Sequence, residues 1–390
     1  MRFRHPDGST VHLSYCTNVH AAESLDGILA QLDRHAVPVR QRLGVDRLGV
    51  GLWIPRQAAG ELAGDPSAVA GLRRALTTRG LEVVSLNAFP YQGFHAARVK
   101  RDVYVPDWAD PVRLRYTLDL ARVLSRLLPD DTARGSISTL PLGWRAWWSP
   151  QRQTAAEAAL ERLAAGLSRL AAEEGRPVRV GFEPEPGCVV ERTEHAVELL
   201  AGRDPEVLGI CLDTCHLAVA FEEPAAALRR LAAAGVSVVK LQASCALHVP
   251  RPRSAETAPV LAAFDEPRFL HQTRESASPL PLAADDLDEA LGPDGLPGRA
   301  PWRVHFHVPL HAAPRPPLGS TRPVLEATLA GLLGAPTAGT HHIEVETYTW
   351  NVLPSGQRPA GPSALAAGIA AELDWTRGEF LGLGLKEDDR

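Results

Sequence analysis

The sequence of 390 residues lacks the features that mark several large classes of protein. No run approaches the roughly 18 consecutive apolar residues that a membrane-spanning helix requires. The first residues include no apolar segment of the kind found in secretory signals, so we expect a protein without such a signal. No glycine-rich fingerprint of a dinucleotide site or a P-loop follows any predicted strand, which argues against the common nucleotide-binding folds.

The sequence also has few cysteines and a small net charge. The five cysteines are odd in number and widely spaced, which is typical of reduced thiols in a cytoplasmic protein. The net charge is only −5, whereas a protein that binds nucleic acid normally carries a basic face. We therefore expect a cytoplasmic protein with a small-molecule metabolite as partner, no nucleic acid and no membrane span. The oligomeric state stays open, with a homo-oligomer as one option.

The sequence does contain a regular alternation of strand-like and helix-like segments. The helix-like segments have apolar residues at three- and four-residue spacing. Eight strand units alternating with helices indicate an α/β fold of the (β/α)8 TIM barrel type rather than an open doubly wound sheet. The predicted strands are residues 13–18, 47–54, 81–89, 136–142, 178–185, 208–213, 236–244 and 342–348. The predicted helices are residues 66–79, 111–128, 154–174, 191–200, 224–234 and 322–333.

Three segments depart from the barrel pattern. Residues 2–12 predict a small hairpin before the first strand. Residues 245–303 form a long insertion after the seventh strand, and connections of that length usually act as lids or binding loops. Residues 302–311 alternate like a strand and predict an extra strand outside the ring. We expect a single barrel domain over residues 1–380, with the insertion as a lid and residues 381–390 as a flexible tail.

Acidic and other polar residues stand at the ends of the last four predicted strands. Successive side chains of a strand point to opposite faces, and here aliphatic residues share one face while polar residues share the other. We therefore expect the polar set in the barrel lumen, at the carboxyl ends of the strands, where barrel active sites are built. The set consists of Glu183, Glu185, Asp213, Lys240, Gln242, Glu344 and Glu346.

Buried carboxylates need a partner, since each unpaired charge costs several kcal/mol. One interpretation is a set of salt bridges in the lumen with Lys240 and Arg179. The interpretation that we favour is one divalent metal ion shared by ligands from four strands. Oxygen and nitrogen ligands of this kind are typical of Mn²⁺, Co²⁺, Mg²⁺ or Zn²⁺. Four of the five cysteines also follow strand ends, but no Cys-x-x-Cys pair exists, and we interpret them as small buried thiols.

Several motifs resemble those of the xylose-isomerase-like barrels, which include sugar epimerases and sugar-phosphate isomerases. Asp213-Thr-Cys-His216 resembles their Asp-Thr-x-His, and Glu185-Pro-Gly-Cys-Val-Val-Glu191 is similar to their Glu-Pro-x-x-x-x-Glu. Lys240-Leu-Gln242 stands where they have His-x-His, and Glu346 stands where they have the final glutamate. The metal ligands that the resemblance implies are Glu185, Asp213, Gln242 and Glu346. It implies that Glu185 and Glu346 also shuttle the proton.

The resemblance implies further that His216 and Glu191 contact the substrate, and we add Asn87, Lys240 and His305 to these predicted contacts. The seventh strand departs from the family pattern, because Gln242 replaces a histidine. His307 or His305 is the candidate replacement, and we include His307 among the metal ligands. The choice between Glu183 and Glu185 as the ligand from the fifth strand stays open.

A second resemblance covers nearly the whole chain. The chain resembles the metabolite traffic protein EboE family, a barrel protein of the Ebo gene cluster, which accompanies proteins that make or move a secondary metabolite. The motifs that carry it are Tyr15-Cys-Thr-Asn18-Val-His20, Asn87-Ala-Phe-Pro-Tyr91-Gln-Gly-Phe-His95, Val103-Tyr-Val-Pro-Asp-Trp108, Ser138-Thr-Leu-Pro-Leu142, Glu183-Pro-Glu-Pro-Gly187, His305-Phe-His-Val-Pro-Leu310 and Glu344-Val-Glu-Thr-Tyr-Thr-Trp350. The resemblance implies a role in secondary metabolism.

The leading hypothesis is a divalent-metal-dependent isomerase or epimerase acting on a sugar-, sugar phosphate-, polyol- or cyclitol-like metabolite. One carboxylate removes a proton beside a carbonyl and another returns it. A second hypothesis is a non-catalytic protein that binds or carries a metabolite, motivated by the replacement at Gln242. A third is a Schiff-base lyase that uses Lys240. A phosphodiesterase for damaged DNA shares the barrel but needs more histidines in the lumen than this acidic chain offers.

Two further sets of residues bear on the substrate. The aromatic residues either form an apolar wall for a cyclic substrate or pack under loops. They are Tyr91, Phe94, Tyr104, Trp108 and Trp144. The arginines of the insertion either hold a phosphate or form a solvated face. They are Arg251, Arg253, Arg268 and Arg274.

Overall fold

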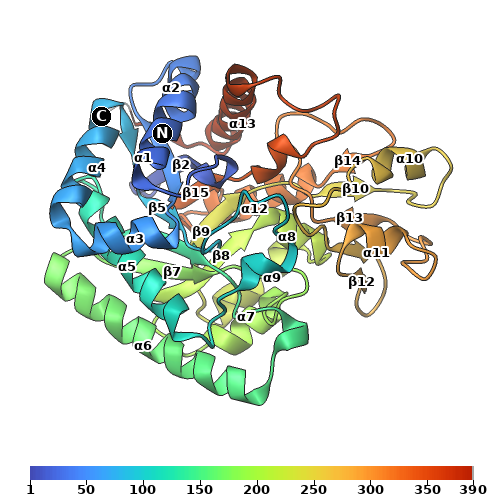
Figure 1. Ribbon diagram of the computed structural model, residues 1–390, viewed down its shortest axis with the longest axis horizontal. Helices are drawn as coiled ribbons and strands as arrows, with labels where there is room; N and C mark the ends of the chain where they lie inside the picture. The colour runs from blue at the N-terminus through green and yellow to red at the C-terminus, as the bar shows by residue number, and fades with distance from the viewer. Residues whose placement is uncertain (389–390) are drawn as a thin grey trace.

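In the computed structural model, which describes residues 1–388, eight parallel strands form a closed ring. The last strand of the ring, β15, pairs with both β9 and β2, so the first and last strands complete the barrel (Figure 1). The ring strands are β2 (Thr10–Cys16), β3 (Leu48–Trp53), β5 (Ser85–Asn87), β6 (Gly135–Thr139), β7 (Val178–Phe182), β8 (Leu208–Asp213), β9 (Val238–Ala243) and β15 (His342–Val345). The predicted TIM barrel is confirmed, and each ring strand overlaps a predicted one.

Helices cover the outside of the ring (Figure 1). The main ones are α2 (Val37–Leu43), α4 (Pro66–Thr78), α5 (Pro111–Leu127), α6 (Pro150–Glu174), α7 (Thr193–Leu200), α9 (Pro224–Ala233), α12 (Arg322–Leu333) and α13 (Pro362–Gly382). α4, α5 and α6 each begin with a proline after a capping residue, which are Asp65, Asp110 and Ser149. The sequence did not predict α13, because its alanine-rich sequence has little amphipathic periodicity.

Shorter elements fill the connections between strands and helices. They are α1 (Leu25–Gln31), a π-helical turn (Leu32–Ala36), α3 (Arg56–Gly64), β4 (Leu81–Glu82), α8 (Thr214–Val219) and 3-10 turns at Thr17–Val19, Lys100–Tyr104, Arg145–Trp147 and Tyr348–Asn351. No helix within residues 1–388 has both the length and the hydrophobicity needed to cross a membrane.

The two ends of the described chain meet beside the barrel. β1 (Arg2–Arg4) pairs antiparallel with β2, so the predicted hairpin exists, but its second strand is the first ring strand itself. β16 (Lys386–Glu387) pairs with β1. Of the tail expected to be flexible at residues 381–390, residues 381–382 therefore belong to α13 and residues 386–388 bond to the backbone of β1. Residues 389 and 390 lie outside the described residues.

The insertion after β9 folds into a small antiparallel sheet to one side of the barrel (Figure 1). Its strands, in spatial order, are β12 (Leu282–Ala284), β11 (Thr273–Glu275), β13 (Trp302–Val304), β10 (Leu247–Val249) and β14 (Gly319–Ser320). Two short helices, α10 (Thr257–Ala262) and α11 (Leu287–Leu291), flank it. The extra strand predicted from Trp302 is β13, and it lies outside the ring as expected. The sheet continues to β14, beyond the predicted end of the insertion at residue 303.

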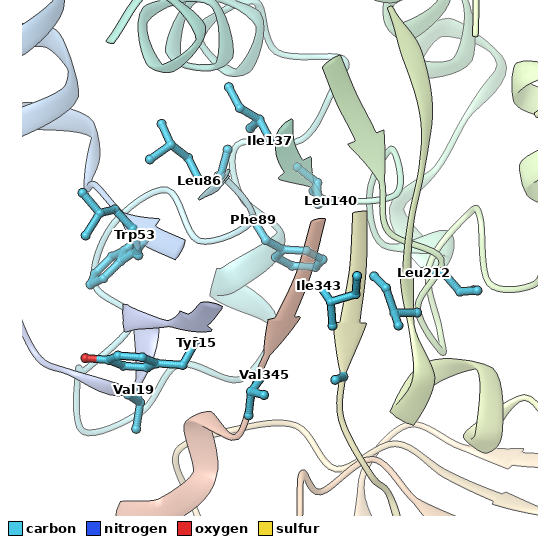
Figure 2. Packing of buried hydrophobic residues seen from close by; sticks show 14 of the residues in the cluster. Tyr15, Val19, Trp53, Leu86, Phe89, Ile137, Leu140, Leu212, Ile343 and Val345 are labelled. Atoms are coloured by element: carbon cyan, nitrogen blue, oxygen red, sulfur yellow. The ribbon is translucent and has the colours of Figure 1, made fainter. Parts of the chain in front are cut away.

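The hydrophobic core joins side chains from many strands of the ring. Figure 2 shows Leu86, Ile137, Leu212 and Ile343, from four different strands, in one cluster of buried residues. Each is at most 2% exposed. Burial of these side chains is the main favourable contribution to folding, and it fixes the strands whose carboxyl ends carry the polar residues.

A buried ion pair lies in the lumen. Lys240 Nζ lies 2.7 Å from Glu344 Oε1 and 3.2 Å from Ser138 Oγ, and Ser85 Oγ donates to Glu344 Oε2 at 2.6 Å. Gly51 makes room for this carboxylate, since a Cβ at that position would lie 1.6 Å from Glu344 Oε2. For these two residues the salt-bridge interpretation of the lumen charges therefore holds.

Replacing Lys240 with Met should lower the free energy of unfolding by roughly 3–5 kcal/mol, because Glu344 would be left charged and unpaired in the lumen. The double variant Lys240→Met/Glu344→Gln should recover most of this loss, since no uncompensated charge remains. Arg134→Met, which removes an exposed pair with Glu206, should cost at most about 1 kcal/mol. Urea unfolding followed by circular dichroism measures all three, and a Lys240→Met protein as stable as the wild type would contradict this account.

Candidate active site

A pocket lies at the carboxyl end of the barrel, where segments that follow the ring strands meet residues of the insertion. Its cavity of about 50 Å³ has room for a few water molecules. The acidic and histidine residues that line it are Glu183, Glu185, His216, His305, His307 and Glu346. All six side chains are buried.

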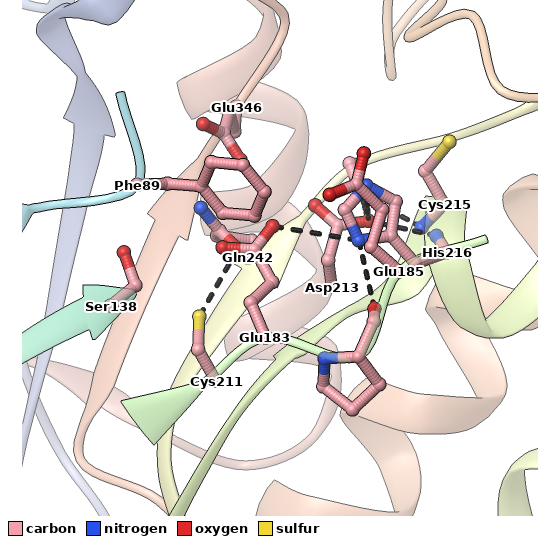
Figure 3. Close-up of polar contacts among 12 residues, drawn as sticks. Phe89, Ser138, Glu183, Glu185, Cys211, Asp213, Cys215, His216, Gln242 and Glu346 are labelled. Atoms are coloured by element: carbon pink, nitrogen blue, oxygen red, sulfur yellow. Dashed lines mark hydrogen bonds and ion pairs between the residues drawn. The ribbon is translucent and has the colours of Figure 1, made fainter. Parts of the chain in front are cut away.

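Three carboxylates gather at the ends of β7, β8 and β15 (Figure 3). One oxygen each from Glu183, Asp213 and Glu346 lies within 4.8 Å of the other two. Within residues 1–388, Glu183 Oε2 and Asp213 Oδ2 are buried and have no hydrogen-bond partner. Like charges at this separation repel one another, and unpartnered buried oxygens are costly, so the group has the chemistry of a cation site.

Neighbouring donors hold the other oxygens of these carboxylates. Asp213 caps α8, and its Oδ1 accepts hydrogen bonds from the backbone N–H of His216 at 2.9 Å and from Ser244 Oγ at 2.7 Å. Glu346 Oε1 accepts from Asn18 Nδ2 at 2.7 Å and from Asn87 Nδ2 at 3.0 Å. Such bonds fix the orientation of a carboxylate and leave the second oxygen available to a ligand.

His307 has a free nitrogen and lies close to one member of this group, Asp213. Its Nδ1 lies 2.7 Å from the backbone carbonyl of Glu346, which can only accept, so Nδ1 carries the proton and Nε2 keeps its lone pair. Nε2 is buried without a partner in the described chain. Nitrogen and oxygen atoms of His307, Asp213 and His216 also lie within 4.8 Å of one another. His307 therefore fits the role of a nitrogen ligand that sequence analysis gave it.

Gln242 is the other metal ligand expected from this part of the chain, but its side chain accepts a hydrogen bond from a thiol. It lies in register with Asp213 on the neighbouring strand, and its Oε1 accepts from Cys211 Sγ at 3.1 Å (Figure 3). Its Nε2 has no partner among residues 1–388. All five cysteines are buried, and none forms a disulfide in this part of the chain, in line with the expected buried thiols.

Glu185 belongs to a second group, with His216 and His305. Its Oε1 accepts from Tyr104 OH at 2.8 Å and from Gln272 Nε2 at 3.4 Å. Its Oε2 is buried and lacks a partner among the described residues. The structure therefore brings Glu183, rather than Glu185, together with Asp213 and Glu346.

The two histidines of this second group face each other with unprotonated nitrogens. His216 Nδ1 donates to the carbonyl of Pro184 at 3.0 Å, and His305 Nδ1 donates to Gln272 Oε1 at 2.7 Å. Their Nε2 atoms are only 3.0 Å apart. In neutral imidazoles both of these atoms carry lone pairs, so the contact is stabilised only by a shared proton or by a cation bound to both nitrogens.

Burial shifts the pKa values of these groups in opposite directions. Desolvation raises the pKa of Glu185 to about 8 and that of Glu346 to about 8, and it raises the pKa of Glu183 well above its ordinary value. It lowers the pKa of His216 to about 4 and that of His305 well below the ordinary value. The histidines are therefore neutral near pH 7, which is the form that binds a metal ion.

Two of the expected substrate contacts are absent from the described pocket lining. Glu191 accepts hydrogen bonds from Arg274 at 2.8 Å and from Arg145 at 2.7 Å, so its charge is already neutralised. Lys240 is held by Glu344 in the lumen. The contact predicted for Glu191 came from the family resemblance, which does not show its arginine partners. For Lys240, strand alternation gives the direction of the side chain but neither its depth nor its partner.

Asn87 and His305 do line the pocket, as does His216. Sequence analysis did not identify Asn18, Gln272 and Tyr348 as site residues, and it considered Tyr104 only as part of an apolar wall. Of the five aromatic residues considered for that wall, Phe94 and Tyr104 line the pocket. Gln272 comes from the insertion, where no periodic pattern marks it. Asn18 and Tyr348 each lie in a motif of the resemblance that covers nearly the whole chain, and that was the one signal available for them.

Comparison with known proteins finds a family that matches this chain. Residues 41–251, more than half of the chain, match the family described as xylose isomerase-like TIM barrel. None of the curated proteins matches the sequence.

Solved structures are similar to this chain at low identity. D-psicose 3-epimerase from Clostridium cellulolyticum H10, solved with D-tagatose, is 12% identical, with 95% of this chain and 99% of that chain covered and a TM-score of 0.50. A putative sugar phosphate isomerase/epimerase from Anabaena variabilis is 15% identical, with 96% and 100% covered and a TM-score of 0.49. The probable 3-DHS dehydratase AsbF from Bacillus anthracis is 15% identical, with 94% and 98% covered and a TM-score of 0.47. On its match over more than half of the sequence, the chain belongs to the xylose isomerase-like TIM barrel family.

Proposed function

We propose that the protein is a divalent-metal-dependent isomerase or epimerase acting on a sugar-, polyol- or cyclitol-like metabolite. The observation that carries this proposal is the group of Glu183, Asp213 and Glu346, whose carboxylate oxygens lie within 4.8 Å of one another in a buried site. The donors that hold Asp213 and Glu346 support it, because they orient the carboxylates without neutralising them.

The residues that would hold the metal are Glu183, Asp213, Glu346 and, through Nε2, His307. This set replaces Gln242 with His307, and it takes Glu183 rather than Glu185 as the ligand that follows β7. Mixed carboxylate and imidazole ligands suit Mn²⁺, Co²⁺ or Zn²⁺, and Mg²⁺ if oxygen ligands dominate. When bound, such an ion orients substrate oxygens and makes a C–H beside a carbonyl more acidic.

Glu185 and Glu346 are the pair that moves the proton in this proposal. Each has one oxygen anchored, Glu185 by Tyr104 and Glu346 by Asn18 and Asn87. Both line the cavity. One carboxylate takes the proton from the carbon beside the carbonyl, and the other returns a proton to the substrate. In this proposal His216 and His305 bond substrate hydroxyl groups.

A second candidate function keeps the site but has no catalysis, so that the protein binds or carries the metabolite. The replacement of a histidine by Gln242 favours it. The resemblance to the EboE family supports a role in secondary metabolism under either candidate.

The lyase alternative is not supported by the surroundings of Lys240. Burial alone would lower the pKa of this ammonium group, but the neighbouring carboxylate of Glu344 raises it above the ordinary value. A Schiff base needs a neutral, accessible amine, whereas Lys240 is charged and fully buried.

Metal binding should depend on the carboxylates of the first group. Protein purified without chelator or affinity tag and then offered Mn²⁺ should hold near-stoichiometric metal by elemental mass spectrometry. Glu183→Gln and Asp213→Asn should each weaken Mn²⁺ binding by at least about tenfold, because each removes a charged ligand. Glu191→Gln is the matched control and should leave metal content unchanged. Full metal content in both ligand variants would contradict the site.

Proton transfer should depend on Glu185 separately from metal binding. In deuterium oxide, the Mn²⁺-loaded protein should introduce deuterium beside the carbonyl of its substrate, which NMR detects across a panel of ketoses and keto-cyclitols. Glu185→Gln should keep its metal and lose roughly 10²–10⁴-fold in exchange rate, the usual size of a general acid–base contribution. A panel member that binds the wild type without exchange would favour the carrier function instead.

A further inference from the structure

One wall of the pocket is apolar, in contrast to the carboxylates and histidines that it faces. This apolar wall consists of Phe89, Phe94, Val103, Phe269, Leu270 and Tyr348. Three of its rings pack on one another, with centroid distances of 5.1 Å for Phe94 and Phe269, 5.0 Å for Phe269 and Tyr348, and 5.4 Å for Phe94 and Tyr348. They come from the connection after β5, from the insertion and from the segment after β15, so distant parts of the chain converge to build it.

The pocket offers little to an anionic substrate. Among its described lining residues Lys100 is the one cation, and its Nζ is bonded to Asp286 Oδ2 at 2.6 Å and to the carbonyl of Glu266 at 3.2 Å. The insertion arginines considered for a phosphate are absent from the described lining as well. Arg274 is paired with Glu191, and Arg253 donates to backbone carbonyls. A phosphate here would face carboxylates without a counter-charge from the protein.

The apolar wall and the lack of a free cation in the described pocket lining together indicate a class of ligand. Resting on the function proposed above, we propose that the substrate is an uncharged hydroxylated compound with an apolar, preferably aromatic, substituent. Its hydroxyl and carbonyl oxygens face the carboxylates and histidines, and its substituent packs against the apolar wall. Because the cavity of about 50 Å³ holds only a few water molecules, the insertion side of the pocket must move outward to admit this substituent. Pockets of this kind gain affinity from apolar area and specificity from a few placed polar groups. Aromatic edges and faces such as those of Phe94, Phe269 and Tyr348 suit a ring best.

The test uses chelating probes that share one metal-binding head. Acetohydroxamate and benzohydroxamate differ by a methyl against a phenyl group, and phosphonoacetohydroxamate adds a negative charge. Titration calorimetry on the Mn²⁺-loaded full chain gives the three dissociation constants. Benzohydroxamate should bind at least about tenfold more tightly than acetohydroxamate, the gain expected from burying a phenyl ring. Phosphonoacetohydroxamate should bind more weakly than acetohydroxamate.

Substitutions in the apolar wall show whether it causes the preference for the phenyl probe. Phe269→Ala should remove most of the preference for benzohydroxamate, and Phe269→Leu, which keeps most of the apolar volume, should retain more of it. Leu282→Ala is the matched control, because Leu282 lies on the same insertion but is 44% exposed. A thermal melt of each variant shows whether it is folded. If Phe269→Ala is destabilised, Phe269→Leu still tests whether the apolar volume at this position sets the preference for benzohydroxamate.

The outcomes separate this inference from the function on which it rests. Equal affinity for the methyl and phenyl probes would overturn the apolar substituent, and tighter binding of the phosphonate would overturn the uncharged class. Either result leaves the metal site and the isomerase intact. If no hydroxamate binds the Mn²⁺-treated protein, the metal site itself fails, and with it the proposed function.

Discussion

Repulsion between buried carboxylates at the mouth of the barrel is the constraint around which the site is built. Glu183, Asp213 and Glu346 come from strands that are distant in sequence, yet the closed ring forces their ends together. The hydrophobic effect fixes the ring and does not permit the acids to move apart. Around them the chain supplies hydrogen-bond donors and neutral histidines, while the lumen cation Lys240 is paired with Glu344. Because burial raises the pKa values of Glu183 and Glu346, a cation that bound there would compete with protons.

In the lumen, by contrast, a buried carboxylate is neutralised by a residue of the protein itself. Glu344 lies two residues before Glu346 on the same face of the chain, but Lys240 neutralises it, and Gly51 leaves the space that it needs. One strand thus carries a carboxylate that stabilises the barrel and, just beyond its end, one that stays available for chemistry. Depth in the barrel, rather than residue type, separates the two roles.

The sequence predicts the ring and part of the site because both depend on periodicity. Alternation on the strands identifies Asp213 and Glu346, whose orientation follows from the strand that each continues. It fails between Glu183 and Glu185, since β7 ends at Phe182 and the backbone beyond it no longer alternates. Tyr104 and Gln272 come from a 3-10 turn and a loop of the insertion, where no pattern fixes the direction of a side chain. α13 escaped prediction because helices rich in alanine show little contrast between their faces.

The division of the site between ring and insertion has a consequence for how affinity is controlled. The acids belong to the ring, whereas His305, His307 and Phe269 belong to a small sheet and loops that pack beside it. A ligand that touches both parts ties them together, so its affinity includes the free energy of holding the insertion in place. By thermodynamic reciprocity, a change that destabilises the packing of the insertion also weakens the binding of the ligand. Substitutions in β10–β14, far from any reacting atom, can therefore retune binding strength while the barrel and its carboxylates stay unchanged.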